Sequence, residues 1–182
     1  MTLKKFVLIP VIIGVLACLI QALDQLLYTS VPPEGNVGFS WISFQSWAVY
    51  FLAGCTVRGG IKAFIAYAIG IAASIVIMLL GGAMTPALGF FAVPVAVGVI
   101  AFCAIFCERS EWLSLVPALF IGAGAFFAFM NYVPNATFCT AALTEMIYCT
   151  IGLIFGYVTI CLRSAYEKKV VEDNSKEEKN KE

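Results

Sequence analysis

Two acidic residues in apolar surroundings are the side chains most able to do chemistry. Asp24 lies towards the end of the first apolar segment, and Glu145 lies near the start of the last. Asp24 is 18 residues from Phe6 and Glu145 is 18 residues from Arg163, which is about 27 Å along a helix. We therefore expect both carboxylates near one face of a membrane. They would be either interfacial groups that reach water or an acidic mouth that binds cations or a polar solute.

The remaining reactive residue types point away from catalysis. Histidine is absent, which removes the commonest acid–base catalyst and metal ligand. The seven cysteines form no C-x-x-C pair and lie mostly inside apolar segments, which is typical of small buried hydrophobes. No nucleotide-binding G-x-x-x-x-G-K-[ST] string occurs. The sequence predicts no catalytic residue, metal site or cofactor, and we do not expect an enzyme.

Small and polar residues recur at helical spacing on several apolar segments. Such stripes are typical of helix faces that meet protein or water and not lipid. The last segment carries Glu145, Gly152 and Gly156 on one face. The candidate substrate pathway consists of Asp24, Glu145, Gln21, Ser43 and Ser46. The glycines expected at helix packing contacts, or lining that pathway, are Gly14, Gly98, Gly122, Gly152 and Gly156.

The elements that must position these residues are membrane-spanning helices. The 182 residues are 62% hydrophobic and 12% charged, whereas soluble domains are about half apolar and about a quarter charged. The apolar segments have the length of a membrane span and lie at about 6–28, 39–57, 63–80, 88–107, 112–130 and 138–162. We predict an all-α integral membrane protein with a six-span domain at 1–163. The charged tail at 164–182 should be disordered and cytoplasmic.

The basic residues predict the orientation. All eleven Lys and Arg residues lie before the first segment, after the second, after the fourth or in the tail. The segments joining spans one to two, three to four and five to six contain none. By the positive-inside rule, both termini are cytoplasmic in a multi-pass protein of the inner (cytoplasmic) membrane.

A possible internal repeat relates the two halves of the chain. The first segment has Pro10 and Gly14 where the fourth has Pro94 and Gly98, at a constant offset. Ile69-Gly70 and Ile151-Gly152 are a weaker match at another offset. Since the first and fourth spans run in opposite directions, a three-plus-three repeat would be inverted, as in many transporters. Chance similarity between apolar helices is the alternative.

Several short strings resemble the YcdZ-like family of small bacterial inner-membrane proteins, which is a domain family of unknown function. These strings are Gly54-Cys55 with Gly59-Gly60-x-Lys62, Val116-Pro117-x-x-Phe120-Ile121-Gly122-Ala123, and Gly152-Leu153-Ile154-Phe155-Gly156-Tyr157. The resemblance covers about residues 40–160. It implies a multi-span inner-membrane protein and gives no substrate, cofactor or catalytic residue.

We therefore interpret the chain as a passive or ion-coupled channel or transporter for a small solute. Its expected partners are the lipid bilayer, an unidentified small solute and further copies of itself, because six narrow-faced helices enclose little space alone. Nucleic acid is not expected. The alternative is an accessory or scaffolding membrane subunit that transports nothing and uses the charged tail as a cytoplasmic contact.

Overall fold

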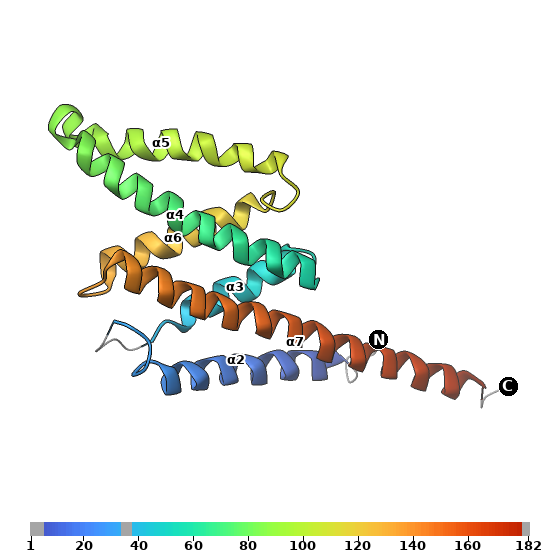
Figure 1. Cartoon of the computed structure of the whole chain (residues 1–182). Coiled ribbons are helices and arrows are strands. Elements are labelled where there is room, and N and C mark those ends of the chain that lie inside the picture. The colour runs from blue at the N-terminus through green and yellow to red at the C-terminus, as the bar shows by residue number, and fades with distance from the viewer. Residues whose placement is uncertain (1–5, 34–37, 180–182) are drawn as a thin grey trace.

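The computed structural model describes residues 6–33 and 38–179, and these residues are helical apart from their connections. Consecutive helices reverse direction across the bundle (Figure 1). The α-helices are α2 (Leu8–Leu27), α3 (Ser40–Leu52), α4 (Val57–Leu88), α5 (Ala92–Ile105), α6 (Val116–Tyr132) and α7 (Phe138–Lys179). Two short 3₁₀ turns, η1 (Gly89–Phe91) and η2 (Phe106–Arg109), lie before and after α5.

The connections gather at two opposite ends of the bundle. Segments 28–33, 38–39, 89–91 and 133–137 lie at one end, which we call the Asp24 end (Figure 1). Segments 53–56 and 106–115 lie at the other, the Arg58 end, where both described chain ends also lie (Figure 1). At this end Arg58 donates to Glu111 at 2.5 Å and lies over the Trp112 ring at 5.4 Å. These contacts join the start of α4 to the connection between α5 and α6.

Much of the described chain has the length and polarity of membrane-spanning helices. Three helical stretches are long and apolar enough to cross a membrane: Leu8–Leu27, Val57–Arg109 and Phe138–Glu172. Helix α6 is a shorter apolar helix. At 13 residues, α3 extends only about 20 Å, less than the roughly 30 Å of a hydrocarbon core. The protein therefore has the helices of a membrane protein, in agreement with the all-α prediction.

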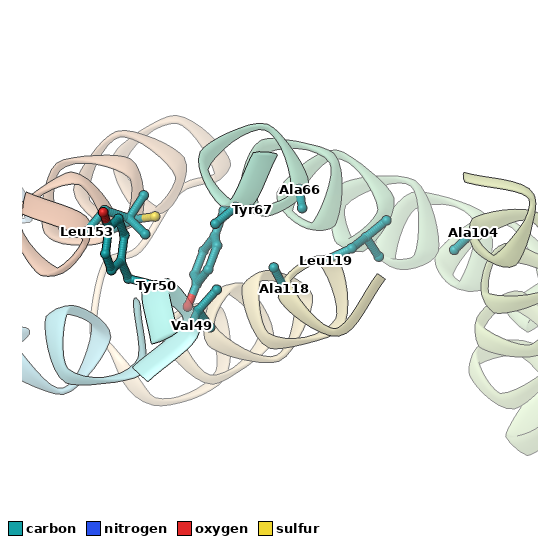
Figure 2. Packing of buried hydrophobic residues seen from close by; sticks show 10 residues of the cluster. Val49, Tyr50, Ala66, Tyr67, Ala104, Ala118, Leu119 and Leu153 are labelled. Atoms are coloured by element: carbon teal, nitrogen blue, oxygen red, sulfur yellow. The ribbon is translucent and has the colours of Figure 1, made fainter. Parts of the chain in front are cut away.

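Two long helices organise the packing. Helix α4 packs most extensively on α6 and also on α5, while α7 packs most extensively on α3 and also on α2. Helices α4 and α7 contact each other between these two groups. Figure 2 shows Tyr67 reaching from α4 towards Val49 of α3, with Ala118 and Leu119 of α6 beside it. Tyr67 is completely buried in this cluster, so the interior is a packed core around the α4–α7 contact.

Helix α4 differs from the predicted third segment at both ends. The predicted segment covers 63–80, but the helix already begins at Val57, because the Thr56 hydroxyl caps it by accepting from the Gly59 amide at 3.0 Å. The helix also continues past residue 80. It includes Pro86 in its last turn, and the chain turns at Gly89, whose φ is +52°.

The tail prediction also differs from the structure. The composition of 164–182 predicts disorder, whereas α7 continues without interruption to Lys179; residues 180–182 of the predicted tail lie outside the described residues. Glu167 accepts from Arg163 at 2.8 Å across one turn, and the Ser175 hydroxyl donates to the Val171 carbonyl at 3.0 Å. A helix already formed by packing extends at little cost through lysine and glutamate, which are good helix formers. Figure 1 shows this extension projecting past the other helices at the Arg58 end.

Candidate functional site

Asp24 joins three segments at its end of the bundle. Its Oδ1 atom accepts from the Phe39 amide at 2.9 Å and from the Tyr148 hydroxyl at 2.5 Å. Gly38, with φ +105°, lies against the carboxylate, where any Cβ atom would overlap it. Asp24 is 3% exposed, so the expectation of a carboxylate that faces water is wrong here. The distance from Phe6 along the helix predicted that Asp24 lies near one end of the bundle. It could not show that the chain at Phe39 folds back over the carboxylate.

The same segment is tied to α7 at a second point. The Thr144 hydroxyl donates to the Pro32 carbonyl oxygen, and Thr144 is fully buried. Asp24 and Thr144 thus connect the α2–α3 connection to the first turns of α7. This arrangement can hold the Asp24 end of the bundle closed.

Glu145 lies in a different environment from Asp24. It is two turns inside α7, about 10 Å from Phe138, and none of its surface is exposed. Neither carboxylate oxygen has a hydrogen-bond partner among the described residues. The same is true of the buried Tyr67 hydroxyl on α4. Tyr67, Glu145 and Cys149 interact electrostatically, so α4 and α7 bring three polar side chains together in the interior.

These groups do not form a recognisable metal centre. No cluster of three or more His, Cys, Asp or Glu side chains suited to a metal ion occurs in the part of the chain that the structure describes. One carboxylate, one phenol and one thiol can instead hold a proton or contact a small polar solute.

Ser43 and Ser46 lie in a close contact between α3 and α7. The Ser43 hydroxyl donates to the Tyr148 carbonyl at 2.8 Å, and the Ser46 hydroxyl donates to the Ser43 carbonyl at 3.1 Å. A Cβ atom at Gly152 would overlap both serines, and one at Gly156 would lie 2.5 Å from the Tyr50 Cβ atom. These residues hold two backbones together in this structure and do not line an open passage.

Gly122 takes part in a similar contact between α4 and α6. A Cβ atom there would lie 2.9 Å from the Tyr67 Cα atom, and one at Gly70 would overlap the Leu119 carbonyl. The Ser74 hydroxyl donates to the Ala123 carbonyl at 3.1 Å across the same pair of helices. Gly122 is therefore at a helix packing contact, one of the two roles considered for it.

Three of the residues predicted at packing contacts or in the pathway do not face the interior. Gly14 and Gly98 are exposed, and a Cβ atom at either would have no heavy atom within 4 Å. Gln21 is also exposed and accepts from the Ser40 hydroxyl at 2.9 Å. The buried face of α2 instead presents Leu16 and Ile20, because these bulky side chains pack against Trp47. Burial of apolar side chains against a tryptophan, and not the positions of glycine and glutamine, therefore determines the rotation of α2.

Sequence reasoning missed the tyrosines that accompany the two acids. Tyr148 follows Glu145 by three positions, but its hydroxyl donates to Asp24. The centroid of its ring lies 5.7 Å from that of the Phe39 ring. Tyr67 lies in the middle of the third apolar segment. A tyrosine hydroxyl so deep in an apolar helix normally needs a partner, and this signal was available from the sequence.

Comparison with known proteins places the chain in a family without assigning a role to these residues. The match to the family described as "Protein of unknown function (DUF1097)" extends over residues 11–163. None of the curated proteins and none of the solved structures compared with the chain matches it significantly. An uncharacterised family agrees with the resemblance noted in the sequence, while the designation YcdZ-like stays a prediction. With 153 consecutive positions matched, the chain belongs to the DUF1097 family of proteins of unknown function.

Proposed function

We propose that this protein is a six-span secondary transporter for a small solute in the inner (cytoplasmic) membrane, with both termini in the cytoplasm. The alternating helix directions and the distribution of Lys and Arg support the topology. Short α3 would cross together with its flanking residues inside the packed bundle, where it meets α7 and not lipid. Irregular backbone at membrane depth is tolerated where protein covers it.

The pattern of helix contacts supports an inverted repeat. If α2, α3 and α4 correspond to α5, α6 and α7, the α3–α7 contact corresponds to the α6–α4 contact. The α4–α5 contact likewise corresponds to the α7–α2 contact, and the α4–α7 contact corresponds to itself. Helices α4 and α7 run in opposite directions, as an axis parallel to the membrane requires (Figure 1).

The glycine contacts add residue-level support to this correspondence. Gly70 of α4 meets the α6 backbone at Leu119, and Gly152 of α7 meets the α3 backbone at Ser43. Gly70 and Gly152 are the pair that the sequence comparison aligned. The α4–α6 and α7–α3 contacts therefore use corresponding glycines on corresponding helices.

The observation that carries the transport proposal is the unpartnered Glu145 carboxylate at the contact between the two halves. Inverted-repeat transporters place their substrate and coupling-ion sites at this kind of interface. An ionisable side chain inside a membrane bundle is costly and is by default a candidate functional group. Glu145 and Tyr67 would contact the transported solute or ion when the halves move apart. Asp24, held by two donors, would keep the Asp24 end closed.

The proposal is tested by uptake into liposomes that contain the purified protein. The panel consists of ammonium, small amines, urea and short carboxylic acids. We expect uptake of at least one solute and a loss of roughly tenfold or more in Glu145→Gln. Glu167→Gln is the matched control, because it makes the same change on an exposed part of α7 and should leave uptake unchanged. Equal uptake by both variants and wild type, or no uptake of any solute, would contradict the proposal.

A second candidate function rests on the α7 extension. Its charged surface projects from the bundle and is available to a cytoplasmic partner (Figure 1). An accessory subunit would lose a co-purifying protein on truncation after Arg163 and would transport nothing. A transporter would keep its uptake after the same truncation. We further propose that the protein assembles as a homo-oligomer, which mass measurement of the detergent-solubilised protein tests directly.

A further inference from the structure

We propose that the Glu145 carboxyl group binds a proton and is the coupling site for proton-driven transport. The coupling part of this inference rests on the function proposed above, whereas the proton site itself does not. The first observation is the complete burial of both carboxylate oxygens with no hydrogen-bond donor among the described residues. An unpaired buried carboxylate is among the costliest groups in a protein and normally takes up a proton to become neutral.

No charged group near Glu145 removes the need for that proton. From α4 it meets the Tyr67 hydroxyl, and on its own helix the Cys149 thiol. Helices α3 and α6 contain no charged residue, and the one acid of α2, Asp24, is held by the Phe39 amide and Tyr148. Lys62 on α4 is half-buried and forms no ion pair with Glu145. Within the described chain, neutrality at Glu145 must come from a bound proton or cation.

The available ligands favour a proton over a metal ion. Hard cations such as Ca²⁺ and Mg²⁺ take about six or more oxygen ligands. In the part of the chain that the structure describes, Glu145 belongs to no group of three or more His, Cys, Asp or Glu side chains that could hold a metal ion. A proton needs only one carboxylate oxygen, and binding it makes the buried group neutral without any further ligand.

The position of Glu145 in the proposed repeat gives the proton a route to both sides. At the spacing that relates Gly70 to Gly152, the counterpart of Glu145 on α4 is Ala63, which is also fully buried. The α4–α7 interface therefore contains the acid Glu145 on α7 and an alanine at the corresponding position of α4. Movement of one half against the other would expose this single carboxyl group alternately at each membrane face, where the proton is gained and released.

The test uses N,N′-dicyclohexylcarbodiimide, an apolar reagent that selects protonated carboxyl groups in apolar surroundings. The carboxyl O–H adds across one C=N bond, with the proton transferred to nitrogen and the oxygen bonded to carbon. Migration of the acyl group to nitrogen then gives a stable N-acylurea without loss of any atom. Full-length protein in detergent should gain the mass of one reagent molecule, and peptide mapping should locate it at Glu145.

Two variants and one ion make this test decisive. Labelling of Glu145→Gln should be at least about tenfold weaker than that of wild type, and labelling of Glu167→Gln should equal that of wild type. Peptide mapping should find no reagent on Asp24, whose Oδ1 atom is covered by the Phe39 amide and the Tyr148 hydroxyl. Labelling should fall as the pH rises and should be unaffected by sodium at constant pH. Absence of labelling at Glu145 would overturn the proton site, and suppression by sodium would replace the proton with a metal cation.

A separate measurement distinguishes failure of the site from failure of the function. An imposed proton gradient should increase solute uptake several-fold in liposomes that contain the wild-type protein. It should not change uptake in liposomes that contain Glu145→Gln. Labelling without any uptake would refute the transporter and retain the proton site. Uptake that is indifferent to the gradient, in protein that labels normally, would retain both the transporter and the proton site and refute the coupling.

Discussion

The two buried acids differ in their bonding more than in their burial. Asp24 has two donors on one oxygen, whereas Glu145 has none among the described residues. A buried carboxylate that accepts hydrogen bonds satisfies the groups that donate to it, whereas one without donors gains no such compensation for its burial. We therefore propose that Asp24 holds the Asp24 end of the bundle closed. Glu145 is the residue that gains and releases a proton.

Removal of the Asp24 carboxylate should destabilise the protein. Asp24→Ala leaves the Phe39 amide and the Tyr148 hydroxyl unpaired, at about 1–3 kcal/mol for each orphaned group. Tyr148→Phe removes only one donor and should cost less, while Tyr157→Phe on an exposed part of α7 is the control. Thermal unfolding in detergent measures all three. Equal midpoints for Asp24→Ala and Tyr157→Phe would contradict the assignment.

At the scale of helices, close crossings explain where small residues are required. Gly152 and Gly156 let α7 approach α3, and Gly70 and Gly122 let α4 approach α6. Gly14 and Gly98 lie in Pro-x-x-x-Gly strings, but they are exposed. The same residue type thus has two environments, which spacing along one helix does not distinguish.

Substitution at a crossing should therefore differ from substitution on an exposed face. Gly152→Ala places a methyl group against Ser43 and Ser46 and should destabilise the bundle by about 1–3 kcal/mol. Gly14→Ala meets no atom within 4 Å and should cause no loss. Unfolding midpoints of the two variants, prepared in the same detergent, make the comparison. A midpoint for Gly152→Ala that equals that of Gly14→Ala would contradict the close α3–α7 contact.

The sequence was sufficient for helices and insufficient for their ends and rotations. Apolar length predicted the helical segments, because burial in lipid and self-contained hydrogen bonding impose helices on such stretches. Helix ends depended on local contacts such as the Thr56 cap, and α4 extends beyond the most apolar residues on both sides. The rotation of α2 depended on Trp47, and the cover over Asp24 depended on a connection that returns to α7. These are long-range contacts, which helical spacing does not contain.

At the scale of the whole molecule, the two ends of α7 should lie on opposite sides of the membrane. Cys139 is exposed near the Asp24 end, and Ser164 is exposed towards the Arg58 end. In a variant with Cys139 as its only cysteine, a membrane-impermeant thiol reagent should label intact spheroplasts. A cysteine-free variant carrying Ser164→Cys should label only after the membrane is opened. The reverse pattern would contradict the proposed orientation.

The unbroken course of α7 joins the candidate proton site to the far end of the protein in one rigid rod. From Gly152 to Lys179 this rod is about 40 Å long, so a tilt of roughly 10° about the crossing would move its tip by about 7 Å. A small rotation at the α4–α7 contact would therefore produce a larger displacement at the end of the extension. Spin labels on Ser164→Cys and Ser110→Cys should report this displacement as a change in their separation when the external pH is changed.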